Sequence, residues 1–151
     1  MRILVCSDSH GRGYDLLAAA EAQPSAEILV FLGDGENDSD AWLSLPGKKL
    51  HRVRGNCDFV SSLPDCTLFQ VADKRVLCAH GHLYRVKHGL EDYRRHAREA
   101  GVQIALFGHT HTPYVDYADG LYLFNPGAIR DKRYGFVDIT DAGTVCGHCQ
   151  L

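Results

Sequence analysis

Short apolar runs alternate, in the first third of the chain, with segments of helical periodicity. The runs have the length and the apolar content of buried strands, and they cover residues 2–6, 27–32 and 49–53. Leu16, Leu17 and Ala20 recur at helical spacing between the first two runs, and a shorter helical segment around Trp42 precedes the third. This alternation of strand and helix predicts βαβ units and a parallel sheet.

The rest of the chain predicts one more helix among further strands. Strands are expected at 67–71, 74–79 and 104–107. A helix is expected before the last of these and ends at Gly101, because apolar residues recur at intervals of three and four: Val86, Leu90, Tyr93, Ala97 and Ala100. After Pro113, runs at 114–117, 121–124, 134–139 and 144–146 are joined by Asp- and Gly-containing turns. The final third is therefore expected to be antiparallel.

The composition is compatible with an α/β fold. The chain of 151 residues is expected to form a single domain, residues 1–151, with 45% hydrophobic and 23% charged residues. Its formal net charge of −3 gives no general attraction to nucleic acid or anionic membranes. No apolar stretch approaches the roughly 20 residues of a membrane span, and the first apolar run is too short for a signal peptide. We therefore expect a cytoplasmic protein, and association of identical chains stays open.

The six cysteines are then expected to be reduced thiols. Cys6 and Cys78 fall in apolar runs and are interpreted as core residues. Cys146 and Cys149 flank His148, but no second pair of Cys or His at zinc-like spacing completes that cluster. A frayed final strand is therefore preferred there to a structural zinc site.

Polar residues that suit metal ions follow five of the expected strands. In chain order they are Asp8 and His10, Asp34, Asn56, His80, and His109 with His111. The Asp8/His10 and His109/His111 pairs are spaced i, i+2, which on an extended segment points both side chains the same way. In parallel sheets, ligands bind beyond the carboxyl ends of the strands. The neighbouring Glu36, Asn37 and Asp38 are interpreted instead as helix-capping or solvated residues.

The donor set consists of oxygen and imidazole without thiolate. Such ligands suit Mn²⁺, Fe²⁺ or Zn²⁺ better than copper(I) or iron–sulfur clusters. Seven ligands are too many for one tetrahedral site, and they suit two metal ions that share a bridging carboxylate.

The order of these blocks resembles that of the calcineurin-like metallophosphoesterases, in particular the YfcE-like branch to which Vps29 is also related. The resemblance rests on Asp-x-His, Gly-Asp, Gly-Asn, His and Gly-His-x-His, and it extends from residue 8 to about residue 128. It implies a four-layer α/β/β/α sandwich of two mixed sheets. It also implies that Asp8, His10 and His111 hold one metal ion, that Asn56, His80 and His109 hold the other, and that Asp34 bridges them.

Two divalent ions would outweigh the charges of Asp8 and Asp34, so the loaded site would attract a phosphate ester. A metal-activated water then makes a side-chain nucleophile unnecessary. Mn²⁺ is the favoured ion, with Fe²⁺, Zn²⁺, Ni²⁺ and Mg²⁺ as alternatives. Asp34 and Asn56 are assigned to catalysis as well as to metal binding, and Asn56 and Arg54 to substrate contact.

The chain departs from its resembled family at Cys57, where many relatives carry a histidine that assists the leaving group. We expect the Cys57 side chain to pack, which leaves His82 as the candidate proton donor. The sequence thus predicts a phosphoesterase that hydrolyses a small phosphoester, with a diester favoured over a monoester. The alternative is a Vps29-like interaction scaffold with metal sites but little catalysis.

Overall fold

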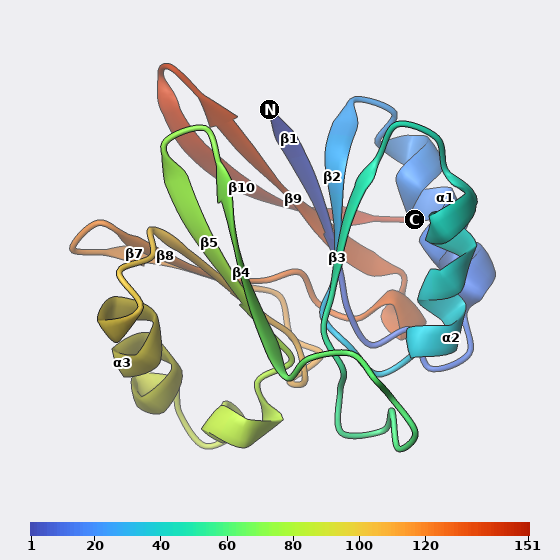
Figure 1. The fold of residues 1–151 in the computed structure, drawn as a ribbon, viewed down its shortest axis with the longest axis horizontal. Helices are drawn as coiled ribbons and strands as arrows, with labels where there is room; N and C mark the ends of the chain where they lie inside the picture. The colour runs from blue at the N-terminus through green and yellow to red at the C-terminus, as the bar shows by residue number, and fades with distance from the viewer.

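Two five-stranded sheets face each other in the computed structural model, which describes all 151 residues (Figure 1). The first sheet has the order β10-β9-β1-β2-β3 and the second the order β4-β5-β6-β8-β7. The strands of the first sheet are β1 (Arg2–Cys6), β2 (Ala26–Phe31), β3 (Lys49–Arg52), β9 (Arg133–Thr140) and β10 (Gly143–Gln150). Those of the second are β4 (Cys66–Val71), β5 (Lys74–Ala79), β6 (Ile104–Phe107), β7 (Tyr114–Ala118) and β8 (Leu121–Asn125).

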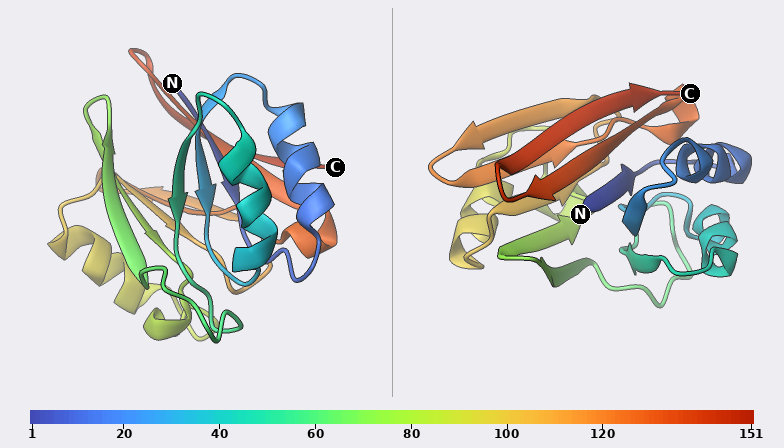
Figure 2. Two further views of the ribbon diagram at one scale, coloured as in Figure 1. Left: turned by 45° about the vertical axis from the view of Figure 1, so that its right-hand side comes forward. Right: turned by 90° about the horizontal axis from the view of Figure 1, so that it is seen from above.

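The helices cover the two outer faces, as the two views of Figure 2 show. α1 (Gly13–Ala22), α2 (Glu36–Ser39) and the 3₁₀ helix η1 (Asp40–Ser44) lie against the first sheet, and α3 (Glu91–Glu99) lies against the second. Two further 3₁₀ turns are η2 (His82–Tyr84) and η3 (Ile129–Asp131). The expected four-layer α/β/β/α sandwich of two mixed sheets is confirmed. No helix is long and apolar enough to cross a membrane.

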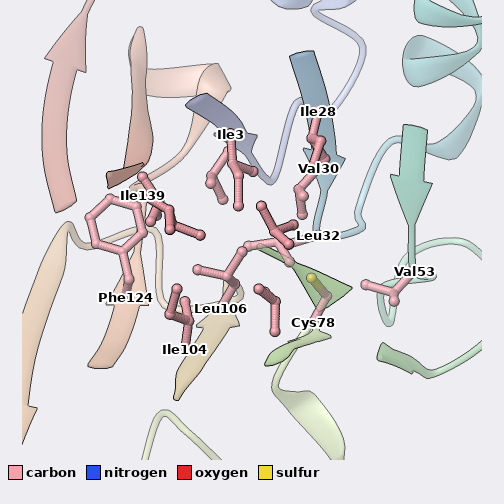
Figure 3. Packing of buried hydrophobic residues seen from close by; sticks show 14 residues of the cluster. Ile3, Ile28, Val30, Leu32, Val53, Cys78, Ile104, Leu106, Phe124 and Ile139 are labelled. Carbon is pink, nitrogen blue, oxygen red and sulfur yellow. The ribbon is translucent and has the colours of Figure 1, made fainter. Parts of the chain in front are cut away.

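Three apolar clusters fill the three interfaces between these layers. Strand alternation produces them, because successive side chains of a strand point to opposite faces. In β1, Ile3 and Val5 point between the sheets, whereas Leu4 and Cys6 point toward α1. Figure 3 shows the cluster between the sheets, to which residues of both sheets contribute. The matching cluster under α3 includes Tyr93, whose hydroxyl donates to the Leu106 carbonyl at 2.6 Å. Buried apolar contacts thus hold the two sheets against each other and the helices against their outer faces.

The strand pairings confirm the first part of the predicted topology and correct the last part. β1, β2 and β3 pair in parallel, as the βαβ pattern predicts. The hairpins β7–β8 and β9–β10 are antiparallel, but β8 also pairs in parallel with β6. The expectation of a wholly antiparallel final third is therefore wrong, since a hairpin pattern describes only the local partner of each strand.

The predicted helix over Val86–Ala100 begins later than its apolar spacing indicates. α3 starts at Glu91, and the preceding segment turns twice, with left-handed φ values of 52° at Arg85 and 149° at Gly89. Val86 is still buried, so it contributes to the cluster from a loop rather than from the helix. The frayed final strand is also wrong, because β10 pairs with β9 over its whole length.

Candidate metal centre

The seven predicted ligands follow the carboxyl ends of strands from both sheets, and the interatomic distances bring them together. Figure 1 shows the strands of the two sheets. Asp8, His10, Asp34 and Asn56 follow β1, β2 and β3 of the first sheet. His80, His109 and His111 follow β5 and β6 of the second sheet. The site is therefore built across the interface of the two sheets.

Asp8, His10 and His111 form one group of ligand atoms, which all lie within 4.8 Å of one another. Asp8 Oδ1 lies 3.0 Å from His111 Nε2 and 3.8 Å from His10 Nε2. The Asp8 carboxylate is fully buried, whereas the two imidazoles are partly open to solvent. A cation can therefore enter from the imidazole side and meet a fixed carboxylate.

Asp34, His80 and His109 form a second group with the same 4.8 Å limit. His80 Nε2 lies 3.4 Å from Asp34 Oδ2, 3.1 Å from His109 Nδ1 and 3.1 Å from Asn56 Oδ1. Asp34 Oδ2 also lies 3.8 Å from His10 Nε2, in the first group. One carboxylate oxygen thus faces both groups, which is the position that a bridging ligand needs.

Two observations indicate that these residues fit cations. Asp8 Oδ2 accepts hydrogen bonds from Ser7 Oγ and the His109 N–H, but the buried Oδ1 receives none. Buried charged oxygens without a partner are costly, so this one suits a metal ligand. In addition, His80 Nδ1 lies 2.7 Å from the Leu32 carbonyl, which accepts its proton. That tautomer leaves the Nε2 lone pair free for a metal ion.

In the second group, the electrostatics favour the metal-binding protonation state of Asp34 and His109 but oppose that of His80. Burial alone would raise the pKa of Asp34, but His80 and the Cys57 N–H hold it well below its usual value. Burial and the neighbouring His80 lower the pKa of His109 to about 4, so its ring is neutral. His80 differs: burial opposes its charged form, but the carboxylates of Asp34 and Asp8 raise its pKa overall. A cation bound there must displace the proton that these carboxylates attract.

The backbone of the site is strained where it carries the ligands. Asp8, His10, Asp34, His109 and His111 all have left-handed φ values, between 45° and 67°. Such values are costly for residues other than glycine and cluster at functional sites. The expectation that His109 and His111 share one side of an extended segment is therefore wrong, and the two rings belong to different ligand groups. Strain of this kind leaves no signal in residue type.

Close contacts of the backbone explain why glycine precedes His109 and Asn56 in the metal-binding motifs. A Cβ at Gly108 would clash with Ser7 Oγ and contact Asp8 Oδ2, and one at Gly55 would clash with the Asp34 carboxylate. Only glycine lets these loops approach the ligands so closely.

Two acidic residues hold the loops together, in a role that the sequence pattern did not predict. Asp58 accepts hydrogen bonds from four backbone N–H groups: those of Asp34, Gly35, Glu36 and Gly55. Asp38 does not cap α2, because Gly35 occupies that position; its Oδ2 accepts from Ser9 Oγ at 2.6 Å and from the Gly11 N–H. The Asp-in-loop pattern gives the only sequence signal for such a role.

Cys57 is exposed rather than packed, which corrects the sequence expectation. Its Sγ lies within 4.8 Å of ligand atoms of both His10 and Asp34. Partial burial and the Asp34 carboxylate raise the pKa of its thiol.

His82 and Arg54 lie beside the ligands rather than among them. The His82 ring centre is 5.4 Å from that of His80, and its buried Nδ1 has no hydrogen-bond partner. Burial and the nearby His80 lower the pKa of His82. Arg54 Nε donates to Asp65 Oδ1 at 2.6 Å, so its guanidinium is already engaged by one carboxylate.

Comparison with known proteins agrees with this geometry. The model of the calcineurin-like phosphoesterase superfamily domain matches residues 1–142. The chain belongs to this family. Calcineurin-like phosphoesterases are metal-dependent hydrolases of phosphoesters. This property accounts for the two groups of possible metal ligands at the carboxyl ends of the strands.

Individual members of the calcineurin-like family align over most of the chain. The probable metallophosphoesterase YsnB of Bacillus subtilis is 31% identical over 88% of this chain and 78% of its own length. Phosphodiesterase YfcE of Escherichia coli K12 is 28% identical over 89% of this chain and 83% of its own. A conserved Streptococcus pneumoniae protein described as a predicted phosphoesterase superposes with a TM-score of 0.85 at 25% identity, covering 99% of this chain and 88% of that one.

The same fold occurs in Vps29 proteins. Vps29 of Entamoeba histolytica, in a zinc complex, gives a TM-score of 0.78 at 18% identity over 99% of both chains. At that identity the likeness concerns the fold alone.

Proposed function

We propose that the protein is a phosphodiesterase that uses two divalent cations to hydrolyse a small phosphodiester. The observation that carries this proposal is the pair of ligand groups, Asp8/His10/His111 and Asp34/His80/His109, with Asp34 Oδ2 facing both. Mn²⁺ is the first candidate for the ions. When bound, such a pair supplies Lewis acidity toward phosphoryl oxygens and lowers the pKa of water.

The protein's own groups have distinct tasks in this proposal. Asp8 and Asp34 fix the cation positions, because both carboxylates are held by backbone N–H groups. Asn56 contributes its Oδ1 beside His80 and adds no negative charge, so the site keeps a surplus of positive charge for the substrate. His82, whose ring centre lies 5.4 Å from that of His80, is the residue that would give a proton to the leaving oxygen. Arg54, whose guanidinium also forms an ion pair with Asp65, would contact the outer phosphate oxygens of the substrate.

Hydrolysis of an artificial bis-aryl phosphate and of the matching aryl phosphate monoester tests the proposal. We expect Mn²⁺-dependent turnover with a higher kcat/KM for the diester, lost on chelation and restored by metal. Asp34→Asn should abolish turnover, since it removes the charge shared by both groups. Asp119→Asn, in the exposed turn between β7 and β8, is the matched control and should retain activity. Activity that survives chelation and Asp34→Asn would refute the proposal.

A Vps29-like scaffold is the second candidate, favoured by the close superposition on Vps29 chains. Metal binding alone does not separate the two, because one Vps29 structure is itself a zinc complex. Turnover separates them. Tight binding of metal without hydrolysis of any diester, monoester or nucleotide would favour the scaffold.

A further inference from the structure

Cys57 extends the ligand set with sulfur. Its Sγ, a ring nitrogen of His10 and a carboxylate oxygen of Asp34 lie within 4.8 Å of one another. A tetrahedral zinc ion, with Zn–S near 2.3 Å and Zn–N near 2.1 Å, separates such a sulfur and nitrogen by about 3.6 Å. Cys57 and His10 are both exposed, so their side chains have room to rotate toward that separation.

The backbone around Cys57 is fixed by the site itself. The Cys57 N–H donates to Asp34 Oδ1 at 2.7 Å, so the other oxygen of the same carboxylate faces the ligand groups. Asp58 ties the residue 55–58 turn to the loop after β2. Asn56 Nδ2 donates to Cys57 Sγ at 3.3 Å. The turn therefore holds the sulfur where it faces His10.

A second observation independently indicates that a cation belongs here. The buried Asp8 Oδ1 has no hydrogen-bond partner and lies 3.8 Å from His10 Nε2, so the imidazole that faces Cys57 also faces an unsatisfied carboxylate. The His10 imidazole thus lies between the carboxylate of Asp8 and the sulfur of Cys57.

We propose that Cys57 binds, through its Sγ, the cation held by His10 and Asp34, and that this thiolate makes that position selective for Zn²⁺ over Mn²⁺. Thiolates favour Zn²⁺, whereas carboxylate and carbonyl oxygens accept Mn²⁺ and Mg²⁺. On coordination the thiol proton passes to solvent, and the thiolate reduces the positive charge of the loaded site by one unit. The second position, with His80, His109 and Asn56, has no sulfur ligand, so we expect it to accept Mn²⁺ as well as Zn²⁺. This inference rests on the metal centre of the proposed function.

Metal binding by the reduced, chelator-stripped full chain tests the proposal. Zn²⁺ and Mn²⁺ affinities are measured by competition with a chromophoric chelator, and Co²⁺ is used as a spectroscopic probe. We expect a sulfur-to-cobalt charge-transfer band in the near ultraviolet. Cys57→Ser should remove this band and weaken the tighter Zn²⁺ site about 10–100-fold, with Mn²⁺ affinity changed far less.

Cys149→Ser is the matched control, because Cys149 lies on β10 beside Gln23 and Tyr134, away from the ligand loops. It should keep both the band and the Zn²⁺ affinity. An unchanged Zn²⁺-to-Mn²⁺ affinity ratio in Cys57→Ser, or a Co²⁺ complex without a sulfur band, would overturn the role of Cys57 and leave the metal centre standing. Absence of any metal binding by the unmodified protein would overturn both.

Discussion

Replacing Asp8 by Asn should stabilise the metal-free protein while it removes stabilisation by metal. Asp8 Oδ2 already accepts from Ser7 Oγ and the His109 N–H, and an Asn oxygen can accept both bonds. The Asn amide then takes the place of Oδ1, 3.0 Å from His111 Nε2, and can donate to a neutral imidazole. The substitution therefore removes a buried charge without creating an unpartnered group.

The magnitude follows from the desolvation of that oxygen. Relief of a buried, unsatisfied polar group amounts to about 1–3 kcal/mol. For a domain of this size, 1 kcal/mol shifts Tm by roughly 2–4 °C, so about 4–8 °C is expected for a gain near 2 kcal/mol. Metal at 100 times its Kd stabilises the unmodified protein by about 2.7 kcal/mol, which Asp8→Asn should largely lose.

Thermal unfolding at pH 8, followed by circular dichroism with and without Mn²⁺, measures both effects. At this pH imidazoles of ordinary pKa are neutral, so their charges do not obscure the comparison. A Tm for metal-free Asp8→Asn below that of the unmodified protein would contradict the reasoning, as would an equal rise in Tm of the two proteins on adding Mn²⁺.

Three further substitutions probe other parts of the structure. Gly108→Ala places a Cβ against Ser7 Oγ, so we expect a loss of about 1–3 kcal/mol in urea unfolding and weaker metal binding; an unchanged midpoint would contradict the close contact. His82→Gln should leave Zn²⁺ affinity unchanged and lower kcat about 100-fold for a poor leaving group but little for a nitrophenolate, and equal losses would exclude proton donation. The Arg2 guanidinium holds the pKa of Asp138 below its ordinary value of 3.8, so the stability that this pair contributes is present above pH 3.8 and is lost as pH falls through the lower folded pKa. Asp138→Asn should therefore destabilise the protein at pH 7 but hardly at pH 2 in urea unfolding, and a pH-independent difference would contradict this sign.

The position of the candidate ligand residues at the carboxyl ends of strands was predictable, because both the end of a strand and the type of a donor residue are local properties of the sequence. An apolar run, a glycine and an Asp or His recur after β2 and β6, and Asp8 and His10 follow the apolar run of β1, so the position of each of these residues along its strand can be deduced without knowing the partner strands. The parallel β6–β8 pairing was not predictable in this way, because the tight turn identifies β7 as one partner of β8 but does not indicate which strand pairs with its other side.

The environments of individual side chains were harder to predict than the ligands. Cys57 was expected to pack because cysteine is commonly buried, but the turn that Asp58 anchors holds it outward. The left-handed φ values of the ligands depend on hydrogen bonds from other loops, such as Asp8 N–H to Gly33 O. Neither property can be deduced from a residue and its immediate neighbours.

The return of the C-terminal hairpin to the first sheet affects how the protein matures during synthesis. The last ligand, His111, precedes β9, yet β1, which carries Asp8 and His10 at its end, obtains its β9 neighbour only from residues 133–140. A nascent chain that stops after the ligand blocks keeps one edge of β1 unpaired. Hydrolytic competence is therefore expected to require synthesis of residues 133–140, so products that stop before them carry the ligand residues without a working centre.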